Sequence, residues 1–229
     1  MEKLKKGMIT VFAVAILIIP IVSIAGDLEP PGPPGRTMHT VDEIYHILEQ
    51  LAGNPAPVGK TAQTETYATG DDEDWEKGVV WPNPRFTDNG NGTVTDNLTG
   101  LIWLKDANCF GSTGWAQALV ECNSLANGSC GLSDGSSAGN WRLPNVKELQ
   151  SLIHYGVYDP ALPNTVGTGK WSNGDPFINV QSLYYWSSTT YAYNPSSAWY
   201  VHMYYGYVYS ASSANKGYSY YVWPVRGGN

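Results

Sequence analysis

The sequence predicts an α+β domain over residues 84–229, in which two helices accompany irregular antiparallel sheets. Short strands are expected at 85–87, 93–95 and 101–104, because Asn-Gly and Thr-Gly pairs of the kind found in hairpin turns separate them. Two segments with the apolar spacing of helices then follow. The remainder of the chain is β-rich to its end.

The two helices are expected at 115–126 and 146–154. The first has one apolar face, made of Trp115, Ala118, Leu119, Cys122 and Leu125. The second begins after Asn145, a good N-cap residue, and carries Glu148 at its third position. This pair forms the sequence pattern of a capping box.

Residues 1–25 have the features of an export signal. Three lysines precede an apolar run from Met8 to Ile24, and small residues at 23 and 25 predict cleavage before Gly26. An uncleaved membrane anchor is the alternative, although the run is short for a bilayer and contains Pro20. Either reading predicts a secreted or cell-surface protein, in a compartment where disulfides persist.

Three segments are expected between the signal and the domain. Residues 26–39 form a Pro/Gly-rich linker, 40–53 a short helix, and 54–83 a second linker with a solvated acidic turn at 71–74. Apolar residues at 41, 44, 48 and 51 have the spacing of a coiled coil. This spacing over residues 41–51 predicts either a coiled coil that forms a homo-oligomer or a helix docked on its own domain.

The three cysteines predict one disulfide. Cys122 lies on the apolar helix face, where a thiol packs as a small hydrophobe, whereas Cys109 and Cys130 flank that helix in polar loops. A Cys109–Cys130 bridge with Cys122 free is the expected pairing, and Cys122–Cys130 is the alternative.

Composition and motifs disfavour several classes of function. The net charge of −7, with 14% charged residues, argues against nucleic acid as a partner, because phosphates require clustered Lys and Arg. The four histidines share no metal-ligand spacing, and neither a nucleophile elbow nor a phosphate-binding Gly loop occurs. We therefore expect a protein that is not an enzyme and that uses no cofactor or metal.

The segment 184–223 has the composition of a contact surface. It holds twelve of the sixteen tyrosines, and its only charged side chain is Lys216. Tyr offers a large rigid contact area with a hydroxyl group, and Ser and Asn add adaptable hydrogen bonds. A strand-rich core is the alternative. The run 204–210, however, would place Tyr on both faces of a strand, so some rings must meet water or a ligand.

Four motifs resemble the Lcl C-terminal domain family, the terminal domain of collagen-like bacterial adhesins. They are FTDNGNGTVTDNLTGLIW at 86–103, WRLPNVKEL at 141–149, YWSST at 185–189 and VWPVRGG at 222–228. The resemblance implies the C-type-lectin-like fold of formylglycine-generating enzymes. It does not imply their activity, which relies on cysteines late in the domain, since no cysteine follows Cys130 here.

The same segment resembles the variable region of a diversity-generating retroelement target protein, in which randomised adenines turn AAC-type codons into Tyr, Ser, Asn and related residues. The ligand-binding positions that this resemblance implies are Tyr193, Asn194, Ser196, Ser197, Tyr200, His202, Tyr204, Tyr205, Tyr207, Tyr209, Ser210, Ser212, Asn215, Tyr218 and Ser219. Trp223 is a further position of this kind, since family members usually carry Arg there. The expected ligand is a protein or glycan at a cell surface. The alternative is a fixed-sequence adhesin that binds glycans or extracellular matrix.

Overall fold

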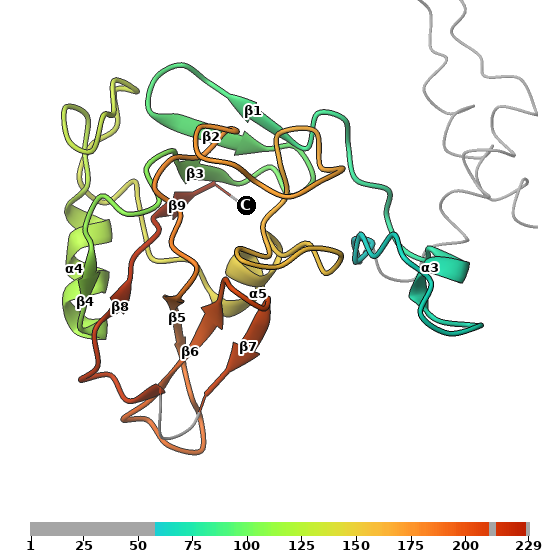
Figure 1. Ribbon diagram of the computed structural model, residues 1–229. Coiled ribbons are helices and arrows are strands. Elements are labelled where there is room, and N and C mark those ends of the chain that lie inside the picture. The colour runs from blue at the N-terminus through green and yellow to red at the C-terminus, as the bar shows by residue number, and fades with distance from the viewer. Residues whose placement is uncertain (1–57, 211–213, 228–229) are drawn as a thin grey trace, which may run out of the picture. The chain divides into compact units, whose positions relative to one another are not determined.

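A computed structural model describes residues 58–210 and 214–227 (Figure 1). The expected signal peptide at 1–25, the linker at 26–39 and the helix at 40–53 lie outside the described residues, as does Ser212.

The first sheet has four strands, and its order is β1-β2-β3-β9. The strands β1 (Phe86–Asp88), β2 (Thr93–Asp96) and β3 (Ile102–Leu104) confirm the three predicted strands, and β9 (Val225–Arg226) pairs with β3. All neighbours are antiparallel. Gly92 is required in the β1–β2 turn, because it has a φ of 84° and an added Cβ would lie 2.4 Å from the Gly131 carbonyl oxygen.

The second sheet has the order β4-β8-β5-β6-β7. It contains β4 (Ser112–Thr113), β5 (Tyr184–Thr190), β6 (Ala198–His202), β7 (Tyr207–Tyr209) and β8 (Tyr220–Tyr221). Strands β5 and β8 are parallel and the other pairs antiparallel, so the sheet is mixed rather than purely antiparallel as expected. The difference arises because β8 returns from beyond β7 to lie on the other side of β5.

Both helices begin where the sequence predicts, but each ends earlier than predicted. Helix α4 (Trp115–Ser124) buries Ala118 and Cys122. Helix α5 (Val146–Gln150) has the predicted capping box, in which the Asn145 side chain accepts from the Glu148 backbone N–H and Glu148 bonds back to Asn145. It ends four residues before the predicted end. The His154 backbone N–H donates to the Ala161 carbonyl rather than continuing the helix.

The segment before the domain contacts it at several points. Residues 72–75, part of the expected acidic turn, form the one-turn helix α3 (Asp72–Trp75). The Thr61 carbonyl accepts from the Tyr155 backbone N–H at 2.9 Å. The Trp81 indole meets the His154 ring edge-on, with centroids 5.4 Å apart. Residues 58–83, expected as part of a linker, therefore line one side of the domain.

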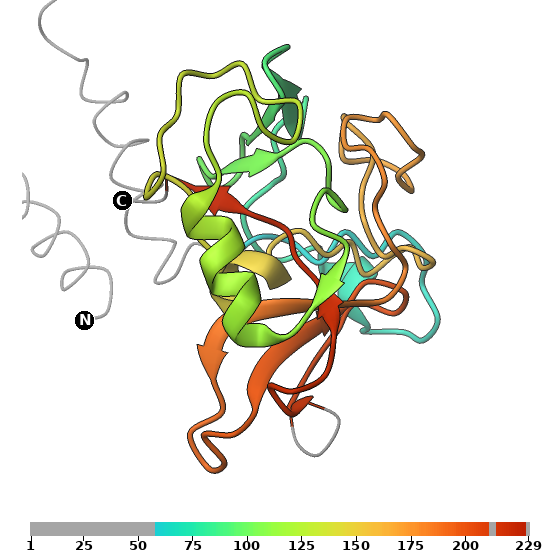
Figure 2. The ribbon, with the colours of Figure 1, turned by 90° about the vertical axis from the view of Figure 1, so that its left-hand side faces the viewer.

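The main core lies between the two sheets. Figure 1 places the first sheet and the β5–β7 strands at opposite ends, with α5 between them, and Figure 2 shows α4 along an outer side. The core includes Trp103, Phe177, Tyr185 and Trp223, all fully buried. A second cluster packs α4, through Cys122, against Trp186 of the second sheet.

Candidate functional site

The outer strands of the second sheet have one core face and one aromatic face. On the core face, Tyr185 pairs with Val201, and Val201 pairs with Val208. On the other face His202 lies between Tyr184 and Tyr207 in register, and Tyr200 pairs with Tyr209. Because side chains alternate along a strand, the register gathers these aromatic residues on one side.

The aromatic face has a buried layer and an exposed layer. We call Tyr184, Tyr200, His202 and Tyr220 the aromatic base, since all four are buried or half-buried. Its rings are in contact, with centroids 4.5 Å apart for Tyr184 and His202 and 5.2 Å apart for Tyr200 and Tyr220.

We call the exposed rings of Tyr205, Tyr207, Tyr209 and Tyr218 the tyrosine surface. Each ring lies against the aromatic base. Tyr205 and Tyr207 contact His202 at centroid distances of 5.4 and 4.8 Å. Tyr209 contacts Tyr200 at 6.0 Å, and Tyr218 contacts Tyr220 at 6.3 Å. Each exposed ring thus has a packing contact with the aromatic base, and a ring whose motion is already restricted loses less entropy when it enters an interface.

The expectation that residues 204–210 put Tyr on both faces of one strand is wrong. Residues 203–206 form a turn, and only Tyr207–Tyr209 is strand, with Val208 towards the core. Gly206 makes the turn possible, because its φ is 75° and an added Cβ would lie 2.6 Å from Ile153 Cγ2. All three tyrosines at 205, 207 and 209 therefore belong to one exposed surface.

The tyrosine surface and the aromatic base contain no Asp, Glu, Lys or Arg, although Asp159 lies close enough to raise the pKa of the neighbouring Tyr204. Burial lowers the pKa of His202, which favours the uncharged imidazole. Burial, together with the neighbouring Tyr200 and Tyr184, raises the pKa of Tyr220 to about 12. Lys216 is engaged elsewhere: its ammonium lies 3.8 Å from the Trp115 ring centroid and donates to Thr190 Oγ1. The tyrosine surface can thus offer hydroxyl groups and ring faces rather than charge.

A second group of expected contact residues lies on loops beside the sheet. Tyr193, Asn194 and Ser196 are exposed in the β5–β6 loop. Figure 1 shows this loop beyond the ends of strands β5 and β6. The Ser196 carbonyl accepts from the Lys216 backbone N–H at 2.9 Å, which brings this loop to residues 214–219. Asn215 and Ser219 are exposed there. The structure thus brings together two separate parts of the predicted set.

The remaining predicted positions are less accessible. Tyr204 is half-buried, and Ser197, Tyr200, His202 and Ser210 are buried. Tyr200 and His202 belong to the aromatic base, so they support the exposed rings rather than forming the outer layer.

Trp223 is corrected from a contact residue to a core residue. It is fully buried where the chain crosses from β8 to β9, that is, from one sheet to the other. Its indole N–H donates to the Leu104 carbonyl at 2.8 Å, and its ring centroid lies 4.9 Å from that of Phe177. A ligand cannot reach this side chain in the folded domain.

Two residues of the site were missed by sequence reasoning. Tyr184 and Tyr220 belong to the aromatic base but have no place among the predicted contacts. Strand alternation could have indicated Tyr184, since it lies two residues before Trp186 on the same face. Tyr220 had no local signal, because its position depends on β8 returning beside β5.

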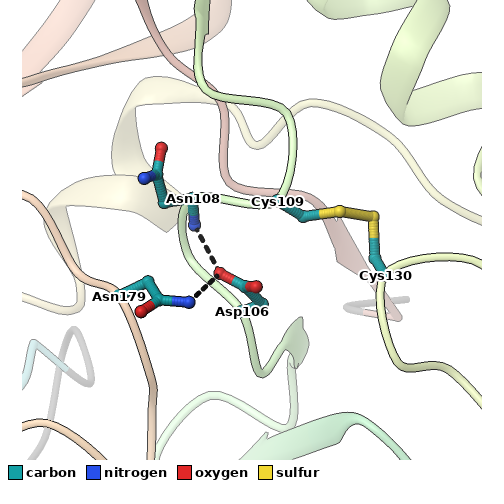
Figure 3. The surroundings of a disulfide bond; sticks show 5 residues. All are labelled: Asp106, Asn108, Cys109, Cys130 and Asn179. Carbon is teal, nitrogen blue, oxygen red and sulfur yellow. Dashed lines mark hydrogen bonds between the residues drawn. A yellow bond between two sulfur atoms is a disulfide. The ribbon is translucent and has the colours of Figure 1, made fainter.

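The Cys109–Cys130 disulfide is present, with Cα atoms 5.7 Å apart, and Cys122 is free and buried, as predicted (Figure 3). Beside the bridge, Asp106 accepts from the Asn108 backbone N–H and from the Asn179 side chain. The bridge therefore ties the loop that follows α4 to a segment anchored by Asp106. A disulfide fits an extracytoplasmic protein.

Within 58–210 and 214–227, no three His, Cys, Asp or Glu side chains gather closely enough to hold a metal ion. In the same stretches, no helix has the length and apolar character needed to cross a bilayer.

The described part of the chain is an α+β domain that carries an exposed tyrosine surface. The Lcl C-terminal domain family matches residues 92–226, and the chain belongs to this family. Membership indicates an adhesin-like or ligand-binding domain. Searches of curated proteins and of solved structures returned no match.

Proposed function

We propose that this protein is exported and binds diverse ligands through the tyrosine surface and the adjoining loops, as the variable protein of a diversity-generating retroelement. The ligand is a protein or glycan at a cell surface, and the domain is a binding module rather than an enzyme. The observation that carries the proposal is the layered aromatic face, in which exposed rings rest on a buried base.

The separation of exposed from buried positions supports the variable role. Tyr193, Tyr205, Tyr207, Tyr209 and Tyr218 all have more than 40% of their surface exposed. Because their side chains make few core contacts, they tolerate exchange at little cost in stability. Between them lie residues that the fold requires.

Those required residues have the opposite character. Trp186 and Val201 are fully buried, and Gly206 occupies a position that no other residue fits without strain. A surface that varies on a constant backbone needs this division, since the scaffold must survive each new set of contacts.

A C-type-lectin-like fold and an export signal complete the proposal. The domain has two small sheets, and its last two strands, β8 and β9, belong to different ones. This arrangement, with α4 packed on an outer side, is compatible with the fold implied by the family resemblance. The disulfide and the apolar run near the N-terminus support export.

The second candidate is a fixed adhesin for glycans or extracellular matrix, favoured by the family match. Exposed aromatic rings suit sugar faces as well as proteins. The net charge of −7 weighs against polyanionic glycans, because like charges repel.

Sequencing the gene and its flanking DNA from many cells of one culture separates the two candidates. The variable-protein proposal expects a near-copy of the 3′ coding region beside the gene. It also expects substitutions at the codons of exposed residues such as Tyr193 and Tyr207, with Trp186 and Trp223 constant. If all copies of the gene have the same sequence and no near-copy of its 3′ coding region lies beside it, the fixed adhesin is the remaining candidate. Substitutions spread equally over buried and exposed codons would contradict both.

A further inference from the structure

The structure has a groove of about 770 Å³ whose lining residues are distant in sequence from those of the tyrosine surface. Residues drawn from 58–61, 79–81, 98–99 and 147–155 line it, and Glu148 is not among them. The volume is in the range of sites that hold small molecules, about 300–1,000 Å³. None of the lining residues belongs to the segment that carries the tyrosine surface.

The groove combines an apolar wall with scattered polar groups. Trp81, Leu98 and Ile153 supply apolar surface, and Thr61, Gln150 and Ser151 supply hydrogen-bonding groups. This mixture is typical of sites for organic molecules, since the apolar wall gives affinity and the few polar groups fix orientation.

The charge of the groove is opposite to that of the chain. Its described lining contains Lys60 and Lys147 but neither Asp nor Glu, in a protein of net charge −7. Lys60 is paired with Glu76 at 2.5 Å. Lys147 Nζ has no ion-pair or hydrogen-bond partner in the part of the chain that the structure describes, and the adjacent Glu148 is paired with Arg142. One positive charge is therefore available to a ligand.

A buried cationic group lies directly behind the wall. The Arg85 guanidinium carbon is 4.4 Å from the Trp81 ring centroid, and Arg85 Nη2 donates to the Ser151 carbonyl at 3.0 Å. Arg85 is fully buried and paired with Asp96, yet its Nη1 has no acceptor among the described residues. Trp81 and Ser151 both line the groove, so the guanidinium lies just behind this wall, but its charge is balanced by Asp96 and Lys147 remains the available cation.

We propose that the groove binds a small anionic amphiphile, with its apolar skeleton against Trp81 and Ile153 and its carboxylate or sulfonate beside Lys147. The proposal is independent of the tyrosine surface. It assigns a second ligand site, lined by other residues than the tyrosine surface, to a chemically distinct class of ligand.

Two probes that share one ring skeleton test this assignment on the full chain. 8-Anilinonaphthalene-1-sulfonate carries the anion, and N-phenyl-1-naphthylamine lacks it. We expect the sulfonate probe to bind saturably at one site per chain, with its fluorescence as the measure of binding. Lys147→Gln weakens that binding by about fivefold, the scale of an exposed ion pair, and leaves the neutral probe unchanged. Trp81→Ala weakens both probes, and Lys170→Gln, at an exposed lysine outside the groove, weakens neither.

Three results would overturn the proposal. Equal weakening by Lys147→Gln and Lys170→Gln would show only a general charge effect. Equal affinity for the two probes would remove the role of the anion. Loss of binding in Tyr205→Ser/Tyr207→Ser, with Lys147→Gln unaffected, would place the probe on the tyrosine surface. Lys147→Gln changes an exposed side chain, so the test remains valid even if Trp81→Ala does not fold. Near-UV circular dichroism shows whether the Trp81→Ala variant is folded.

Discussion

Replacing Trp223 by Ala tests whether this position belongs to the scaffold rather than to the contacts. The indole is fully buried and meets three aromatic rings, those of Trp103, Phe177 and Tyr185, at centroid distances of 4.9 to 5.6 Å. Truncating a buried Trp to Ala costs about 3–5 kcal/mol. We expect the upper part of that range, because the change also removes the buried hydrogen bond to the Leu104 carbonyl.

A loss of this size is a large part of the total stability of a domain, about 5–15 kcal/mol. For a domain of this length it lowers the midpoint of thermal unfolding by about 10–20 °C, measured by circular dichroism under oxidising conditions. Trp75→Ala is the matched control, since Trp75 is 62% exposed and should change the free energy of unfolding by less than about 0.5 kcal/mol. Equal, small effects of the two substitutions would refute the assignment of Trp223 to the core.

Three further perturbations test other parts of the account. Gly206→Ala should cost about 1–3 kcal/mol and displace the turn that carries Tyr205, because its Cβ would meet Ile153; an unchanged melting midpoint would contradict this. Reducing the disulfide that joins Cys109 and Cys130, 21 residues apart, should lower the free energy of unfolding in urea by about 3 kcal/mol, and no shift would show that the bridge is not formed in solution. Burial lowers the pKa of His202, so the unfolded chain binds its proton at a higher pH than the folded chain does. Stability is therefore lost as the pH falls below about 6.5, by at most about 1.4 kcal/mol per unit, and His202→Phe should make urea-unfolding curves between pH 6.5 and 5 less pH-dependent.

The parts of the fold that depend on neighbouring residues could be predicted from the sequence. The hairpin turns of β1 to β3 and the capping box at Asn145 follow from local chemistry, and the loop positions of Cys109 and Cys130 favoured the observed disulfide over the Cys122–Cys130 alternative. Helix ends were less predictable. The end of α5 is set by the bond from His154 to Ala161, and nothing within the helical pattern indicates it.

The parts that depend on distant contacts could not be predicted. The composition of the segment indicated a contact surface, but its division into layers depends on the register of β5, β6 and β7. Trp223 lies in a segment rich in exposed aromatics, and only the crossing of the chain between the two sheets buries it. Tyr220 enters the aromatic base for the same topological reason.

The central claim is that the tyrosine surface binds the ligand, and an array of cell-surface proteins and glycans tests it most directly. We predict that the wild-type chain binds at least one arrayed ligand, and that Tyr205→Ser/Tyr207→Ser weakens this binding tenfold or more while the melting midpoint stays within a few degrees. The matched control, Tyr67→Ser/Trp75→Ser, replaces two exposed aromatic side chains outside both the tyrosine surface and the groove, and should bind as the wild type does. Binding that survives the first pair of substitutions, or that only the control pair abolishes, would contradict the account.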